Sequence, residues 1–288
     1  MLKRSATIVL LAPYLGGAAV LIALPTLVTF ALAFFQYDGL SAPVWNAGRN
    51  FGLALADPRL GIAVANSLFF VAFSVPLRTL GALALALLLD RPRRGAAFYR
   101  AAIYLPTVIP DAAYALIWLW ILNPLYGPLN MILGALGLPA PAWLADAGWA
   151  KPALALMSLF QIGEGFVVML AALHGVPREC LDAARVEGGT RWQVFRHIAL
   201  PLITPWLALL TVRDTIATFQ STFTPAYLMT GGDPYYATLF LPLLAYEEAA
   251  EGLRFGLGAA MTVILVSITA LAIAGLYLFF RRRGHEDA

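Results

Sequence analysis

The chain has 288 residues, of which 61% are hydrophobic and only 12% are charged, and its mean hydropathy is +0.78. A soluble domain carries about 25% charged residues, so this composition excludes an ordinary soluble protein and indicates a chain solvated mostly by lipid. The net charge of +3 says little as a total, and we expect no nucleic-acid partner.

Six apolar runs are long enough to cross a bilayer, which takes roughly 20 mostly apolar residues. In chain order they are Ile8–Phe35, Val64–Leu89, Ala102–Leu122, Ala153–Leu173, Trp206–Leu228 and Leu257–Phe280. The first run follows Lys3 and Arg4 but is far longer than the apolar core of a signal peptide, which has about 7–15 residues, so we expect it to be retained. The runs predict an all-α integral membrane protein with six transmembrane helices.

Lysine and arginine in the short loops predict the orientation, because positively charged loops stay in the cytoplasm. Thirteen basic residues fall on the side of both termini and four on the other side. We therefore expect a multi-pass protein of the cell (inner) membrane with both termini in the cytoplasm. The expected parts are an N-terminal helix with its outer loop (1–60), a transport domain (61–280) with a cytoplasmic loop at 176–202, and a basic tail (281–288).

Several motifs of enzymes and metal proteins are missing. The sequence has no G-x-x-x-x-G-K-[ST] stretch, so it predicts no nucleotide bound in a P-loop. No motif suggests a catalytic triad, and the single Cys180 and three scattered histidines suggest no metal site. We expect neither a cofactor nor a catalytic site in this chain.

Five ionisable residues lie within the predicted spans, where each charge costs at least about 2.5 kcal/mol. They are Arg78, Asp111, Glu164, Arg213 and Asp214. Such residues indicate a polar pathway through the bundle, although Arg78 and Asp111 are also compatible with structural ion pairs between helices. Because Arg213 and Asp214 are adjacent, their side chains point about 100° apart on a helix, and at least one should find its partner elsewhere.

Glu164 stands between two glycines that allow close approach, and Gln161 is expected on the same helix face. An amide and a carboxylate together suit the binding of hydroxyl groups. Aromatic residues around Gln220 form a second candidate group, although such stripes are more often packing. The candidates for the substrate pathway are Gln161, Glu164, Phe219, Gln220, Phe223, Asp111 and Asp214.

The stretch "LDAARVEGGTRWQVFRHIALP", Leu181–Pro201, interrupts the apolar sequence. It predicts a short helix that ends at Gly188-Gly189, and then a second helix that begins with a T-x-x-Q capping box at Thr190 and ends at Pro201. Val194, Phe195 and Ile198 are expected on one exposed side. From the residues alone, this elbow is either a docking element or a helix pair on anionic lipid.

The elbow resembles the EAA motif of binding-protein-dependent ABC importer permeases. The matching residues are Asp182-Ala183-Ala184, Glu187-Gly188-Gly189, Phe195, Ile198 and Leu200-Pro201. It departs from the usual motif where Asp182 replaces Glu, Glu187 replaces Asp and Gly189 replaces Ala. The stretches "ANSLFFVAFSVPL", "IWLWILNPLYGPLN" and "LMTGGDP" are similar to the carbohydrate-uptake branch, which includes maltose- and glycerol-3-phosphate-type permeases.

This resemblance implies a type I ABC importer permease fold. It also implies a second homologous permease, two ATP-binding subunits that hold the ATP, and an extracytoplasmic substrate-binding protein. Nine of these ten residues, all except Gly189, would then couple the elbow to an ATP-binding subunit. The substrate would be a di- or oligosaccharide. The alternative is a stand-alone secondary transporter or channel that uses the intramembrane charges as an ion path.

Overall fold

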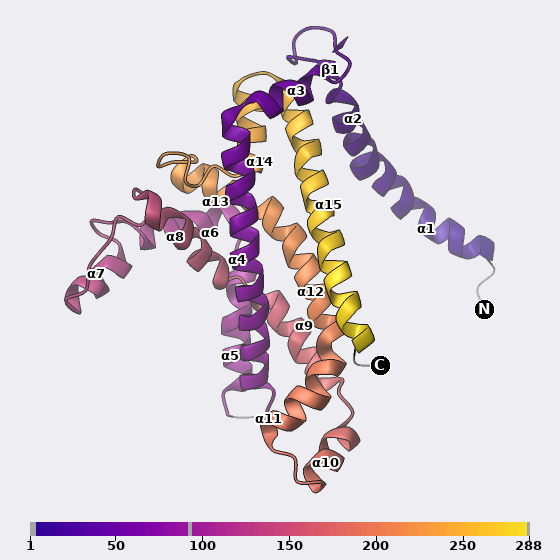
Figure 1. The fold of residues 1–288 in the computed structure, drawn as a ribbon, viewed down its shortest axis with the longest axis vertical. Helices are drawn as coiled ribbons and strands as arrows, with labels where there is room; N and C mark the ends of the chain where they lie inside the picture. The colour runs from indigo at the N-terminus through magenta and orange to yellow at the C-terminus, as the bar shows by residue number, and fades with distance from the viewer. Residues whose placement is uncertain (1–3, 92–93, 287–288) are drawn as a thin grey trace. The chain divides into compact units, whose positions relative to one another are not determined.

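The computed structural model describes residues 4–91 and 94–286, and the side chains of residues 10–91 and 94–281. In this part nearly all regular structure is helical, and the one sheet is a two-stranded antiparallel hairpin. The chain divides into two compact units, residues 1–61 with 244–267 and residues 62–243 with 268–288 (Figure 1). The expected basic tail at 281–288 lies almost entirely outside the described side chains.

The first unit starts with an N-terminal helix and contains the hairpin. Its elements are α1 (Arg4–Ala18), η1 (Ala19–Ala23), α2 (Leu24–Leu32), β1 (Phe35–Gln36), β2 (Val44–Trp45), α3 (Arg49–Ala56), η5 (Glu247–Glu251) and the first part of α15 (Phe255–Glu286). Asn50 holds the hairpin to α3, because its side-chain amide donates to the carbonyls of Ala33 (3.0 Å) and Phe35 (2.8 Å). At Gly256 a side chain would collide with the carbonyl of Phe35, so glycine lets α15 begin directly against the hairpin.

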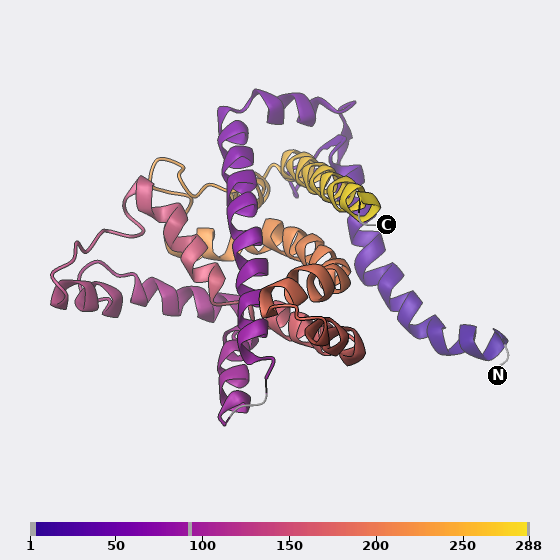
Figure 2. The ribbon, with the colours of Figure 1, turned by 60° about the horizontal axis from the view of Figure 1, so that its bottom comes forward.

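The second unit contains most of the long helices, the elbow and the candidate substrate-pathway residues. Its elements are α4 (Pro58–Leu89, shared with the first unit), α5 (Ala96–Tyr104), η2 (Leu105–Val108), α6 (Asp111–Ile121), α7 (Pro128–Ala135), α8 (Ala147–Leu159), α9 (Gly163–His174), α10 (Arg178–Val186), α11 (Arg191–Val194), η3 (Phe195–Ala199), α12 (Leu200–Ser221), α13 (Phe223–Pro225), η4 (Ala226–Thr230) and α14 (Leu241–Tyr246, shared). Within this unit α7 lies away from the bundle, beyond α6 and α8, in two views (Figures 1 and 2).

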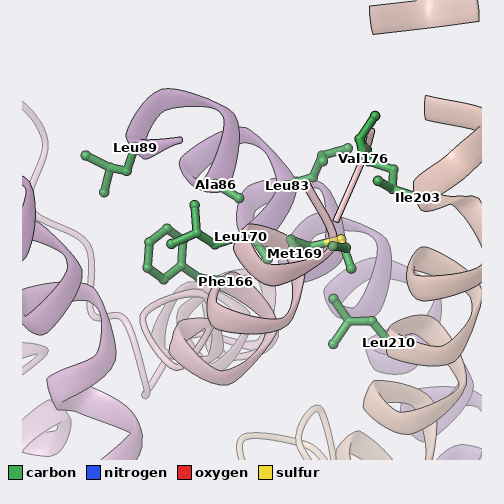
Figure 3. Packing of buried hydrophobic residues seen from close by; sticks show 11 residues of the cluster. Leu83, Ala86, Leu89, Phe166, Met169, Leu170, Val176, Ile203 and Leu210 are labelled. Atoms are coloured by element: carbon green, nitrogen blue, oxygen red, sulfur yellow. The ribbon is translucent and has the colours of Figure 1, made fainter. Parts of the chain in front are cut away.

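A tightly packed cluster joins α4, α9 and α12. Phe166 and Met169 of α9 are fully buried, as is Ile203 of α12, and they pack with Ala86 of α4. Figure 3 shows these side chains gathered where the three helices meet. In lipid, where apolar surface alone does not drive helices together, close van der Waals packing of this kind supplies much of their association.

Asn66 of α4 anchors the segment that follows η4. This side chain is only 6% exposed. Its amide donates to the carbonyls of Tyr236 (2.8 Å) and Leu239 (3.0 Å), and its oxygen accepts from the Lys151 ammonium at 2.9 Å. Every polar atom of the amide is thus satisfied, which a buried side chain requires.

Four described helical stretches are long and apolar enough to cross a membrane, and two bent pairs bring the number to six if each pair is one span. The third and fourth predicted spans correspond to these pairs, so each of the two is divided at a bend. One bends by 104° between Val108 and Asp111, and the other by 47° between Leu159 and Gly163. Pro106 and Pro110 explain the first break, because proline lacks an N–H and cannot continue the helical hydrogen bonds.

Candidate functional site

The elbow between α9 and α12 contains the expected first helix and glycine stop. The N–H of Gly189 donates to the carbonyl of Ala184 (2.9 Å) and that of Gly188 to Arg185 (3.1 Å). These two bonds, with Gly188 in the left-handed region at φ +87°, form a Schellman cap. A Cβ on Gly189 would lie 2.7 Å from the carbonyl oxygen of Ala184, which explains why glycine fits here in place of the usual alanine.

The capping box is confirmed at the start of α11. The Thr190 hydroxyl accepts from the N–H of Gln193, and the Gln193 side chain accepts from the N–H of Thr190. The prediction that Pro201 ends the second helix is wrong, because η3 runs directly into α12 and Pro201 lies in its first turn. The π-helical turn of η3 shifts the hydrogen-bond register just ahead of the residue that has no N–H to donate.

The apolar surface of the elbow is not the one expected. Val194 is buried, and Phe195 and Ile198 are half-buried, so the prediction that these three form an exposed ridge is wrong. The exposed apolar side chains are Val186, at 88%, and Trp192, at 64%. Val186 and Trp192 are therefore the large apolar side chains of the elbow that stay exposed among the described residues.

Phe195 connects this surface to the bundle. Its ring lies 5.7 Å from the ring of Trp192, and its side chain packs against the buried cluster of α4, α9 and α12. Leu181 and Leu200 pack against the same cluster. A displacement of Trp192 would therefore reach the transmembrane helices through packed side chains.

Four of the five intramembrane charges form one network. Arg78 of α4 approaches Asp214 of α12, with 3.8 Å between Nε and Oδ2. Arg213 bonds Asp214 at 2.9 Å and also forms an ion pair with Glu164 of α9. The expectation that the side chains of Arg213 and Asp214 point apart is wrong, because the long Arg213 side chain bends toward Asp214 and pairs with it. The expectation that at least one of them has a partner elsewhere is confirmed, because Arg213 also pairs with Glu164 and Asp214 with Arg78.

The two glycines beside Glu164 serve helix packing. A Cβ on Gly163 would lie 2.7 Å from the Cα of Tyr104, and one on Gly165 would lie 3.2 Å from Leu210. Glu164 itself is about half exposed and paired with Arg213. Gln161 lies in the break between α8 and α9, so the prediction that it shares a helix face with Glu164 is wrong.

A cavity of about 30 Å³ with a mixed polar and apolar lining lies between α4, α6, α8 and α12. Arg78, Asp111, Gln161 and Thr218 contribute its polar lining, and Phe70 is among the apolar residues. Of the seven substrate-pathway candidates, Asp111 and Gln161 border this cavity. Thr218 was not among the residues predicted from sequence, because a single threonine in an apolar helix does not by itself indicate a binding site.

The other candidates lie elsewhere. Asp214 is buried in the ion network and Phe219 is buried at 1% exposure. Gln220 is exposed, and Phe223 stacks on Tyr227 with 5.5 Å between ring centroids. The structure thus brings together two of the predicted pathway residues and adds Arg78 and Thr218 to them.

In the first unit, a second charged cluster surrounds Glu248, which is 2% exposed. Arg59 and Arg254 both pair with its carboxylate, and Arg59 also binds Asp57 at 2.8 Å. Burial opposes ionisation of Asp57, but hydrogen bonds from the side chain and backbone of Arg59 outweigh it and lower its pKa. In the nearby loop, the N–H groups of Ser41 and Leu40 lower the pKa of Asp38 to about 2.

The helical membrane fold, the elbow predicted on the cytoplasmic side and the intramembrane ion network define a membrane transport subunit. Residues 78–285 match the family described as the binding-protein-dependent transport system inner membrane component, and the chain belongs to this family. It is a permease subunit of an ABC importer and not itself an enzyme, because in this family the ATPase is a separate subunit.

Curated relatives cover most of the chain. The probable ABC transporter permease protein YesP of Bacillus subtilis is 31% identical over 266 residues, which are 91% of this chain and 85% of the relative. The sn-glycerol-3-phosphate transport system permease protein UgpA of Agrobacterium fabrum is 33% identical, covering 82% and 80%. The trehalose/maltose permease MalF of Thermococcus litoralis is 28% identical, covering 92% and 90%.

A solved structure has the same fold. A chain of a bacterial ABC transporter for import of the acidic polysaccharide alginate superposes with a TM-score of 0.83 at 20% identity, covering 96% of this chain and 95% of the other. The expected type of fold, an ABC importer permease in the membrane, is thereby confirmed.

Proposed function

We propose that this chain is one of two homologous permeases in a sugar importer driven by two ATP-binding subunits, which hold the ATP. A substrate-binding protein outside the membrane delivers the sugar, and the elbow faces the cytoplasm. A curated relative supports a sugar, since it is named for trehalose and maltose. Di- and oligosaccharides are the leading substrates.

The elbow is the observation that carries this proposal. Two helix caps fix its backbone, and Val186 and Trp192 project from it and stay largely exposed among the described residues. An amphipathic element of this kind suits a hydrophobic groove in an ATP-binding subunit. Closure of the two ATP-binding subunits would move Trp192, and Phe195 would pass the motion to α9 and α12.

The assembly can be tested by purification. The tagged chain, purified from the membranes of the cells that naturally produce it, should retain a second permease and an ATPase through affinity and size-exclusion steps. Recovery of the chain as a lone, ion-coupled transporter would contradict the proposal and favour the stand-alone transporter.

The coupling surface can be tested with Trp192→Ala. A buried interface tryptophan contributes at least about 2 kcal/mol, so we expect ATP-driven uptake in proteoliposomes to fall at least tenfold. Trp120→Ala is the control, because Trp120 is also half exposed, at 55%, but lies on α6. Equal uptake by the two variants would remove Trp192 from the coupling surface.

A further inference from the structure

A larger pocket, of about 260 Å³, lies within the first unit, where the hairpin, α3 and the start of α15 meet. Its charged lining residues are Asp38, Arg49 and Arg254. The volume is far above the roughly 10–15 Å³ that one water needs and approaches the about 300 Å³ at which small-molecule sites begin. This pocket shares no lining residue with the cavity beside Arg78.

The pocket lies where two candidate membrane spans end. The Leu10–Leu32 span stops just before it, and the Phe255–Arg281 span begins in its wall. In the same wall, the ring of Tyr37 lies 5.8 Å from that of Phe255, and Trp45 of the neighbouring strand is exposed. Tyrosine and tryptophan gather at the level of the lipid headgroups. The pocket is therefore at the depth where the phosphate and ammonium groups of lipids lie.

Two opposite charges of the pocket have no partner among the described residues. Arg49 is exposed and forms no hydrogen bond or ion pair with any of them. Asp38 accepts three hydrogen bonds from Leu40 and Ser41, but all three go to Oδ1, so Oδ2 accepts none. Because these bonds hold the pKa of Asp38 at about 2, its carboxylate is ionised at neutral pH.

The third charge of the pocket is already compensated. Arg254 pairs with the buried carboxylate of Glu248, which also pairs with Arg59. The pocket thus offers one free cation, Arg49, and one free anion, Asp38. A ligand with both a phosphate and an ammonium group satisfies the two charges, whereas an anion without an ammonium leaves Asp38 as a repulsive neighbour.

The surroundings of the pocket favour a lipid over a small soluble zwitterion. Leu53 and Leu253 belong to the wall and are half exposed. The helix that leads up to the hairpin, α2, has no buried residue. Acyl chains gain apolar contact against such side chains while the headgroup occupies the pocket, and a soluble molecule does not.

We propose that this pocket binds the headgroup of a phosphatidylethanolamine-type lipid, with Arg49 on the phosphate and Asp38 on the primary ammonium. The ammonium donates N–H bonds to the carboxylate, which the quaternary ammonium of phosphatidylcholine lacks, and phosphatidylglycerol has no ammonium at all. The inference goes beyond the proposed function, because it concerns a lipid of the surrounding membrane and does not depend on the cargo.

Photocrosslinking tests the pocket. The purified transporter is placed in phosphatidylcholine nanodiscs with a small amount of photoreactive phosphatidylethanolamine, and the yield is measured on the peptide of residues 36–57. Unlabelled phosphatidylethanolamine should compete, whereas phosphatidylglycerol and the soluble headgroup glycerophosphoethanolamine should not. Equal competition by phosphatidylglycerol would overturn a zwitterion site, and competition by the soluble headgroup at the same concentration would overturn the lipid.

Arg49→Gln should lower the crosslinking yield about fivefold, the size of one exposed charge pair, and Arg49→Lys should restore most of it. Because Arg49 has no partner among the described residues, the thermal unfolding midpoint in detergent should not fall. Arg178→Gln is the matched control, since Arg178 on α10 is also exposed and unpaired within the described residues but lies outside the pocket. Equal yields from the two glutamine variants would overturn the site.

Asp38→Asn tests the ammonium contact. Asparagine keeps the oxygen that accepts from the N–H groups of Leu40 and Ser41, so the loop is retained, but it removes the negative charge. We expect phosphatidylglycerol to compete in this variant as well as phosphatidylethanolamine does. An unchanged preference for phosphatidylethanolamine would overturn the role of Asp38.

A protein partner in the pocket would give a different result. If Arg49→Gln left the crosslinking yield unchanged and instead weakened the binding of the substrate-binding protein to the nanodiscs, the lipid assignment would be overturned. None of these measurements uses sugar uptake, so failure of the lipid site leaves the proposed function standing.

Discussion

Asn66 shows how one polar side chain stabilises a membrane protein. It joins α4 to Tyr236, Leu239 and Lys151, which lie far away in the sequence. Removing the amide leaves two carbonyls and an ammonium without their partner, and each unsatisfied buried group costs about 1–3 kcal/mol. The contribution of this residue is therefore larger than that of a single hydrogen bond.

We predict that Asn66→Leu lowers the free energy of unfolding by about 3 kcal/mol. Thermal unfolding of the purified complex in detergent measures the loss as a lower midpoint. Gln220→Leu is the control, since this exposed amide forms no bond with another described residue and should change stability by less than about 0.5 kcal/mol. A midpoint for Asn66→Leu equal to that of the control would contradict the anchoring role.

At the scale of elements, the elbow separates what local sequence determines from what packing determines. The glycine stop and the capping box of Thr190 were predictable, because both depend on residues within one helical turn. The burial of Phe195 and the exposure of Trp192 were not, because they depend on where the distant side chains of α4 and α9 lie. The break at Pro110 had a local signal, which the length of the apolar run obscured.

The two glycines of the elbow should differ when changed to alanine. The Cβ of alanine in Gly188→Ala would meet no other atom, but the left-handed φ of this position would cost alanine roughly 1–2 kcal/mol. Gly189→Ala must displace the carbonyl of Ala184 and so breaks the cap itself. We expect both variants to insert normally by membrane immunoblot and Gly189→Ala to lose more uptake. Parental uptake by Gly189→Ala would show that the cap geometry is dispensable.

At the scale of the whole molecule, the intramembrane charges were predictable as a set but not as pairs. Their positions in apolar runs identified Arg78, Glu164 and Asp214 as charged residues whose placement in the membrane is unfavourable unless they have a partner or a function. Which helices they join depends on how α4, α9 and α12 pack against one another, and this packing cannot be predicted from the spacing of the residues in the sequence. For the same reason, Thr218 became a candidate only once its unpaired hydroxyl was seen beside Arg78.

The network predicts unequal effects for its two carboxylates. Asp214→Ala leaves buried Arg78 without its counter-ion, so we expect a loss of about 3–5 kcal/mol. Glu164→Gln should cost less than about 1 kcal/mol, because the Glu164 pair is half exposed. Thermal unfolding measures both, and the double variant Arg78→Ala with Asp214→Ala should recover part of the loss. Equal losses for the two single variants would contradict the network as described.

The contacts of Asn66 also have a consequence for biosynthesis. Lys151 follows it by 85 residues and Tyr236 by 170. At roughly 5–20 residues per second, a ribosome needs about 10 to 30 s to make the later partner after α4 has emerged. During that interval α4 is in the translocon or the bilayer with an unsatisfied amide. The nascent chain should therefore depend on an insertase or a lipid headgroup to shelter this residue until synthesis of the outer segment is complete.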